Sequence, residues 1–198
     1  MVENGIGFKA VMLGHFLMII CGLFYLVWWV VTFRPGGVRE TVDTAHFLLF
    51  AALSGLSGLI IILFGLSTQT NHTRLFSSWT IIGFGVLFYI LLYFLTVYIL
   101  KRQATTELLL IIGWGMLEFA VVNWMYGAEF IQNKIPVVLF VGILLIMIGS
   151  LLCYAEYYRL GAMAGYIAGM IPLILITIWM TGILVILLMR VFKIFKIN

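Results

Sequence analysis

Charged residues are scarce in this chain. Only 9% of its 198 residues are Asp, Glu, Lys or Arg, whereas 65% are apolar and the mean hydropathy is +1.23. An ordinary soluble domain is about 25% charged and about 45–50% apolar. A soluble fold of this length could not hide so much apolar surface from water. The composition therefore excludes a soluble globular protein and predicts an integral membrane protein embedded in a lipid bilayer.

Cysteine is scarce too, with only Cys21 and Cys153, each inside an apolar segment. A free cysteine in such surroundings behaves as a small hydrophobic residue. Neither has a second ligand at the spacing of a zinc site or a redox pair, so we expect no metal and no cofactor. The formal net charge is +4, but the basic residues are scattered at segment ends, as is usual in membrane proteins. Nucleic-acid binding is therefore not expected.

Long apolar runs, in contrast, are abundant. Six of them can cross about 30 Å of hydrocarbon at 1.5 Å per residue. They extend over about residues 11–33, 45–66, 79–100, 108–126, 136–158 and 163–189. The runs are continuous rather than alternating, which disfavours a β-barrel. We expect an all-α integral membrane protein in which residues 1–198 form a single domain, a bundle of six transmembrane helices.

Six helices also divide into two halves of three, as in transporters built from inverted repeats. Aligning the halves places Leu13-Gly14-His15 opposite Ile112-Gly113-Trp114. A 3+3 inverted repeat is therefore one interpretation, although two apolar helices match this well by chance.

Basic residues are distributed almost evenly over the two ends of the predicted helices. The side of the amino terminus carries six and the opposite side five. The positive-inside rule therefore decides little. The tail, residues 190–198, repeats Arg190, Lys193 and Lys196 every three positions beside phenylalanines, a basic amphipathic pattern that suits an anionic cytoplasmic leaflet. We expect a multi-pass protein with both termini in the cytoplasm.

Glu118 lies at the middle of the fourth apolar run, where it cannot reach water at the end of its helix. An ionisable residue at this depth costs roughly 2.5 kcal/mol or more and commonly faces a bundle interior or a wet cavity. Trp114 shares its helix face, whereas Asn123 lies about 140° away. The functional interpretation is a carboxyl that binds a proton or solute, with Trp114 and Asn123 along the path. The structural alternative is one interhelical hydrogen bond, worth about 0.6 kcal/mol in membranes.

Three further polar residues could belong to such a path or stabilise the bundle. His15 lies one turn into the first run and His46 opens the second, so they face opposite membrane surfaces and cannot share one haem or metal ion. Each histidine is either interfacial or a proton relay. Ser57 lies in Gly55-Leu56-Ser57-Gly58, which resembles the nucleophile motif of rhomboid proteases. A protease would need a histidine on a later membrane helix, and the chain has none there, so close helix contact is the better explanation.

Two features near the carboxyl end have both a structural and a functional interpretation. Glu156 and Arg159 are three residues apart at the end of the fifth run, where an ion pair is expected. Together with His46, on the same predicted side, they could rim an entrance. Gly169 and Pro172 indicate either tight packing of a kinked helix or a hinge in a broken helix that lines a solute path.

The leading hypothesis is a small-solute or ion transporter or channel with Glu118 as its proton or substrate site. A second hypothesis is a non-catalytic membrane subunit or scaffold of a larger complex, and homo-oligomers fit both. A third, a lipid-modifying enzyme, would need Glu118 or Glu156 beside another titratable group. The connecting segments show no acidic cluster, phosphate-binding loop or Ser/His/Asp set, so we assign no catalytic residue.

Overall fold

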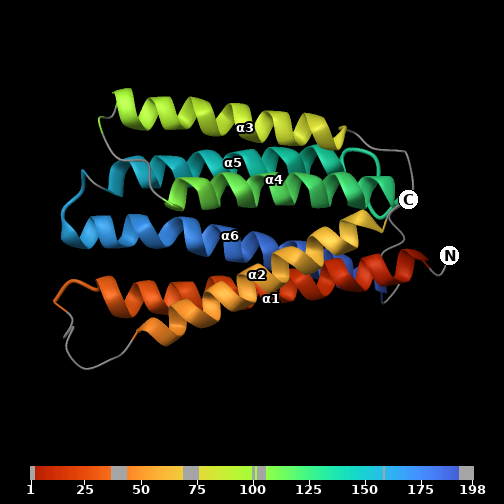
Figure 1. The fold of residues 1–198 in the computed structure, drawn as a ribbon, viewed down its shortest axis with the longest axis horizontal. Helices are drawn as coiled ribbons and strands as arrows, with labels where there is room; N and C mark the ends of the chain where they lie inside the picture. Colours follow the sequence, from red (N-terminus) through yellow and green to blue (C-terminus); the bar gives the residue numbers. More distant parts are fainter. Residues whose placement is uncertain are drawn as a thin grey trace. The chain divides into compact units, whose positions relative to one another are not determined.

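The computed structural model of the chain describes residues 3–36, 44–68, 76–99, 101, 106–157 and 159–191. Over these ranges the backbone forms long helices joined by short connections, with no β-strand among the described residues (Figure 1). The predicted all-α class is therefore confirmed. Contacts group the chain into two compact units, the first made of residues 1–70 and 152–198 and the second of residues 71–151.

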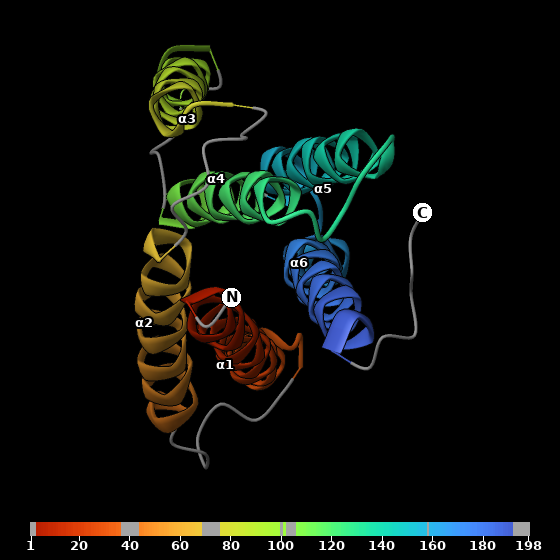
Figure 2. The same cartoon turned by 90° about the vertical axis from the view of Figure 1, so that its right-hand side faces the viewer.

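The first unit contains α1 (Glu3–Phe33), α2 (Ala45–Ser67) and α6 (Ala162–Val191). Helix α1 lies against both of the others (Figure 2). Its contact with α2 is a contact between backbones: a β-carbon on Gly14 would lie 2.8 Å from the carbonyl oxygen of Gly58, and one on Gly65 would lie 2.7 Å from that of Gly7. The glycines are spaced seven residues apart on each helix, which keeps them on one face. Small residues thus allow α1 and α2 to approach closely.

Helices α1 and α6 run antiparallel, because Gly22 lies against Thr177 and Trp29 against Gly169. The beginning of α1 and the end of α6 therefore lie at the same end of this unit. The sequence predicted that both termini lie on one side of a membrane. The assignment of that side to the cytoplasm stays a prediction, and the tail beyond Val191 lies outside the described residues.

The second unit contains α3 (Ser78–Phe94), its π-helical continuation η1 (Leu95–Ile99), α4 (Thr106–Gly127) and most of α5 (Ile135–Tyr157). Helix α3 packs on α4, where the side chain of Met116 rests on Gly85. Helix α5 also contacts α4: Met147 rests on Gly115, and the rings of Phe119 and Phe140 stack at a centroid distance of 5.3 Å. Helix α4 is therefore the element on which this unit is built.

The turn that ends α4 explains how α5 returns along it. Glu129 adopts a left-handed conformation with φ of 58°, and the N–H of Phe130 donates to the carbonyl of Met125 at 2.9 Å. The N–H of Glu129 donates to Tyr126 at 3.0 Å, and the rings of Trp124 and Phe130 meet edge to face at 5.2 Å. These bonds and the apolar contact form a Schellman motif, which stops the helix and reverses the chain.

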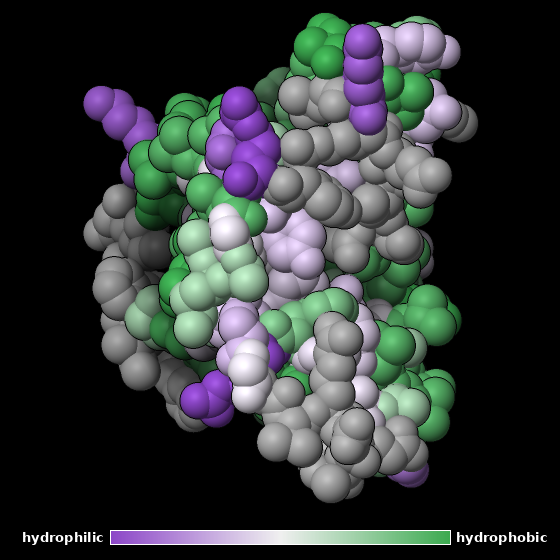
Figure 3. All heavy atoms as spheres, turned by 90° about the vertical axis from the view of Figure 1, so that its left-hand side faces the viewer, coloured by the Kyte–Doolittle hydropathy of each residue, from purple (hydrophilic) through white to green (hydrophobic). Residues whose placement is uncertain are grey.

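All six helices are long and apolar enough to cross a membrane. Each helix also leaves large apolar side chains exposed. The view in Figure 3 shows hydrophilic residues (purple) among hydrophobic ones (green). The chain is thus an integral, multi-pass membrane protein. Helix boundaries agree with the predicted runs within a few residues, except that α1 begins at Glu3 instead of about residue 11. A helix can extend past the hydrocarbon into the polar layer, where apolar residues no longer mark it.

The inverted repeat stays a prediction, although the two aligned glycines have different surroundings. Gly14 is buried against the backbone of Gly58, whereas Gly113 is exposed and a β-carbon on it would meet nothing within 4 Å. The close glycine packing of α1 on α2 is therefore not reproduced at the aligned position of α4.

Candidate functional site

Glu118 is completely buried, with 0% of its surface exposed. It lies at the middle of α4, whose membrane span is 67% buried, against 28% or less for the other five spans. A carboxylate removed from water costs several kcal/mol unless hydrogen bonds or an opposite charge compensate it. Glu118 is therefore enclosed by protein, and it is the starting point of the candidate site.

Two buried polar side chains of the same unit accompany Glu118. Trp114 is only 5% exposed and Ser150, on α5, is 0% exposed. Within the described part of the chain, the indole Nε1 of Trp114 and the hydroxyl Oγ of Ser150 have no hydrogen-bond partner. Leaving a buried polar group unsatisfied costs about 1–3 kcal/mol. Both groups are therefore available to a bound molecule.

The pairing of α4 with α5 brings these groups to one flank. Met147 of α5 rests on Gly115 of α4, and Ser150 lies about one turn beyond Met147. Because α5 runs antiparallel to α4, Ser150 lies near the level of the turn that precedes Gly115. A helical side chain tilts toward the amino end of its helix, which carries the indole of Trp114 to that level. At about 100° per residue, Trp114, Glu118 and Ser150 face the same side of the α4–α5 pair.

Asn123 has a different environment, although it also lies on α4 and is only 4% exposed. Its Oδ1 accepts a hydrogen bond from the N–H of Phe76 at 3.1 Å, and its Nδ2 donates to the carbonyl of Phe76 at 2.7 Å. One backbone residue thus satisfies both ends of the amide and fixes the chain just before α3. These contacts support a structural role, and a place for Asn123 along a solute path stays a prediction.

Replacing Asn123 with aspartate should test this structural role. The substitution keeps the size and the acceptor but sets a carboxylate oxygen, in place of the amide donor, against the carbonyl of Phe76. Because both oxygens are acceptors and Asn123 is buried, we expect a loss of about 2 kcal/mol of unfolding free energy. Thermal unfolding in detergent measures it. The matched control is Asn133→Asp, because Asn133 is exposed and aspartate tolerates its φ of 57°. Equal melting temperatures of the Asn123→Asp and Asn133→Asp variants would contradict the prediction.

The remaining path residues, His15 and Ser57, belong to the first unit. His15 is fully buried in α1, and its Nδ1 lies 2.8 Å from the carbonyl oxygen of Val11. Since a carbonyl only accepts, this bond assigns the proton to Nδ1. Ser57 is exposed on α2, on a different face from Gly58. A path that joins these residues to Glu118 stays a prediction.

The expected entrance residues lie at helix ends. Arg159 forms an ion pair with Glu156 at 3.2 Å, and the two side chains are 68% and 48% exposed. His46 is exposed in the first turn of α2. An exposed ion pair contributes about 0–1 kcal/mol, so it neither requires nor excludes a second role.

The expected hinge lies in a helix that is continuous. Helix α6 runs through Pro172, whose missing N–H cannot bond the carbonyl of Ala168. Gly169 provides the surface on which the indole of Trp29 lies, and the Nε1 of Trp29 donates to the carbonyl of Tyr166 at 3.2 Å. The segment before Pro172 is thus attached to α1, and bending at this point stays a prediction.

Sequence reasoning missed Ser150, because one serine in an apolar helix has no distinctive neighbours. A signal was present, however: Pro136, Ile143, Met147 and Ser150 recur at intervals of seven, four and three, and all are buried. This spacing marks one helix face. Within the described residues, no three His, Cys, Asp or Glu side chains come together as metal ligands would.

Comparisons of the chain with models of protein families, with curated proteins and with solved structures found no match in any of the three. The function is therefore argued from the residues of the site.

Proposed function

We propose that this membrane protein is a small-solute or ion transporter or channel, and that Glu118 binds the solute or proton. The observation that supports the proposal is the complete burial of Glu118 on the most enclosed helix, beside buried polar atoms that have no hydrogen-bond partner among the described residues. An acid at such depth commonly serves an ion or solute pathway.

Asn123 provides the contrast within the same helix. Where a polar side chain stabilises this unit, as Asn123 does, both of its polar ends are bonded. The polar atoms of Trp114 and Ser150 are not. Leaving each of these groups unbonded costs about 1–3 kcal/mol of stability. An average hydrogen bond in a membrane contributes only about 0.6 kcal/mol. Selection for stability alone would remove them, whereas a ligand that bonds to them explains their presence.

The test is a thermal-unfolding screen of the detergent-purified protein against ions and small solutes, repeated on Glu118→Gln. A ligand at 100 times its dissociation constant adds about 2.7 kcal/mol of stability. We expect at least one such ligand for the native chain and none for Glu118→Gln, with both proteins folded. The matched control is Glu129→Gln, which removes an exposed acid in the turn after α4 and should keep the ligand response.

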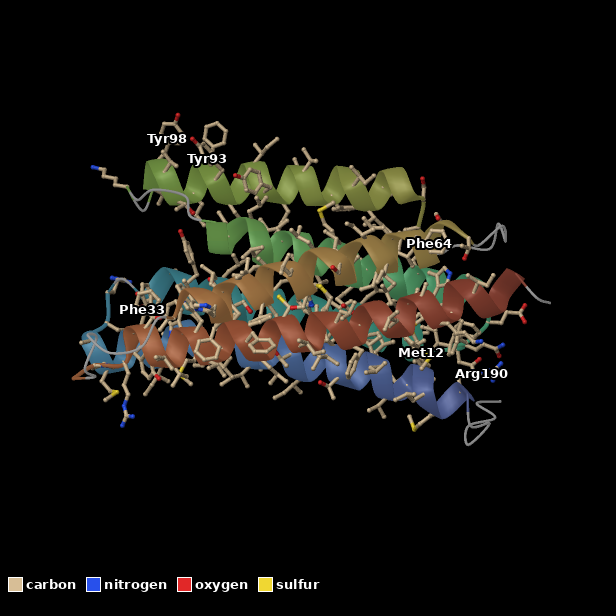
Figure 4. The ribbon with its side chains drawn as sticks, turned by 60° about the horizontal axis from the view of Figure 1, so that its bottom comes forward. Met12, Phe33, Phe64, Tyr93, Tyr98 and Arg190 are labelled. Atoms are coloured by element: carbon tan, nitrogen blue, oxygen red, sulfur yellow. The ribbon has the colours of Figure 1, made fainter. Side chains whose placement is uncertain are left out.

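The second hypothesis, a scaffold subunit, would use an exposed apolar surface such as that of α3 and η1. Tyr93 of α3 and Tyr98 of η1 project away from α4 (Figure 4), and Phe84 of α3 and Ile99 of η1 are 67% and 71% exposed. Lipid or a partner subunit could cover this face. If no ligand stabilises the native chain and a partner co-purifies with it, the transporter proposal is wrong and the scaffold hypothesis replaces it.

A further inference from the structure

We infer that the first unit binds the headgroup of an anionic phospholipid at the end where α1 begins and α6 ends. Lys9 of α1 and Arg190 of α6 hold the phosphate, and exposed apolar side chains of α1 contact the acyl chains. The inference does not use Glu118 and goes beyond the proposed function.

The packing of α1 on α6 places Lys9 and Arg190 at a similar depth. Gly22 of α1 lies against Thr177 of α6. Lys9 precedes Gly22 by thirteen residues, and Arg190 follows Thr177 by thirteen residues. At 1.5 Å per residue, each cation is therefore about 20 Å from that contact along its helix. Because the two helices run antiparallel, both distances lead to the same end of the unit, where Figure 4 labels Arg190.

Both cations are exposed, and no acidic side chain that the structure describes in this unit lies at their end. Glu156, the acid that it does describe there, pairs with Arg159 ahead of the start of α6, at the opposite end. Glu3 begins α1 six residues before Lys9, nearly two helical turns further out. The two positive charges are therefore available to an anionic ligand.

A phosphate group is the anion that this pair of side chains fits. Arginine binds a phosphate through two parallel N–H donors, and lysine adds a compact positive charge. The long aliphatic stems of both side chains let their charged ends reach the headgroup layer. Each Lys or Arg near an anionic membrane surface contributes about 1 kcal/mol, and basic residues between transmembrane helices bind lipid headgroups. The pair at the ends of α1 and α6 has this arrangement.

The surface of α1 next to Lys9 suits an acyl chain. Leu13 and Phe16 follow Lys9 by four and seven residues, so the three residues lie on one face of the helix. Leu13 and Phe16 are 51% and 52% exposed, and Leu23 continues this face at 50%. A phospholipid held at Lys9 covers these side chains with its acyl chain, whereas a soluble phosphate leaves them bare. The occupant is therefore a lipid.

The test measures lipid binding to the full-length, detergent-purified chain by native mass spectrometry. The probes are phosphatidylglycerol, which is anionic, and phosphatidylcholine with the same acyl chains and no net charge. We expect the native chain to bind phosphatidylglycerol roughly 25-fold more tightly, because each cation contributes about five-fold, equivalent to about 1 kcal/mol. Lys9→Gln and Arg190→Gln should each weaken this binding about five-fold, and the double substitution should abolish the preference.

Two exposed cations elsewhere in the chain are matched controls. Lys134→Gln removes a lysine from the turn before α5, and Arg159→Gln removes an arginine that already pairs with Glu156. Both variants should keep the native affinity for phosphatidylglycerol. All four substitutions are at exposed positions, so the melting temperatures in phosphatidylcholine should remain close to that of the native chain.

Three outcomes would overturn the inference. The first is equal affinity of the native chain for the two lipids. The second is an unchanged preference in the double variant, which keeps Lys193 and Lys196, since the tail alone would then hold the lipid. The third is displacement of the lipid by an equal concentration of glycerol phosphate, which would identify a site for free phosphate. The ligand screen on Glu118 uses soluble solutes, so the two proposals fail independently.

Discussion

Replacing Gly58 with leucine is expected to separate α1 from α2 and unfold the first unit. A β-carbon at this position would lie 2.9 Å from the carbonyl oxygen of Gly14 and 3.2 Å from the β-carbon of Leu17. Neither atom is the movable end of a side chain, so the helices themselves must move apart. Overpacking of a core by smaller groups already costs about 1–3 kcal/mol. For a whole leucine side chain against backbone we expect more than about 3 kcal/mol.

The loss should be visible as aggregation or a lowered melting temperature in detergent. Gly182→Leu is the matched control, because Gly182 lies inside α6, is exposed, and has nothing within 4 Å of the position of a β-carbon. That variant should be as stable as the native chain or slightly more stable, since leucine favours helix by nearly 1 kcal/mol over glycine. Equal stability of the two variants would show that the close approach of α1 and α2 is wrong.

The sequence predicts the helices well but not their neighbours. Six apolar runs suffice to locate six helices, because a span needs a fixed length of continuous apolar residues. The motif around Gly58 also predicted a close helix contact correctly. Its partner, Gly14, and the exposure of Ser57 one residue away could not be predicted, because an apolar helix with little amphipathicity does not reveal which face meets protein and which meets lipid.

The candidate site was predictable to the same extent. The burial of Glu118 follows from its position at mid-span, whereas the roles of Asn123 and Ser150 depend on contacts with other elements. Asn123 bonds to Phe76, 47 residues earlier in the chain, and Ser150 gains its place only from the pairing of α5 with α4. Contacts between distant segments are set by the packing of whole helices, which local patterns do not encode.

Trp29 illustrates the same limit, because a tryptophan at the end of an apolar run is usually an interfacial anchor. The structure buries it to 7% exposure, with its ring 4.5 Å from Phe33, a residue labelled in Figure 4, and 5.8 Å from Tyr157. Its indole also lies on Gly169 and donates to Tyr166 at 3.2 Å. One side chain therefore joins α1 to the first turns of α6, ahead of Pro172.

Trp29→Ala is therefore expected to cost about 3–5 kcal/mol, the usual loss for a large buried aromatic residue. The lost contact lies at the start of α6. Amide hydrogen exchange should therefore accelerate more in the residues that precede Pro172 than in those that follow it. Trp28→Ala, which removes the neighbouring and less buried indole, is the control and should cost less. Trp29→Phe keeps part of the packing but loses the bond to Tyr166, and should fall between the two. Equal losses of stability for Trp28→Ala and Trp29→Ala would mean that Trp29 is an interfacial anchor after all. In that case only the residues that follow Pro172 hold α6 against α1.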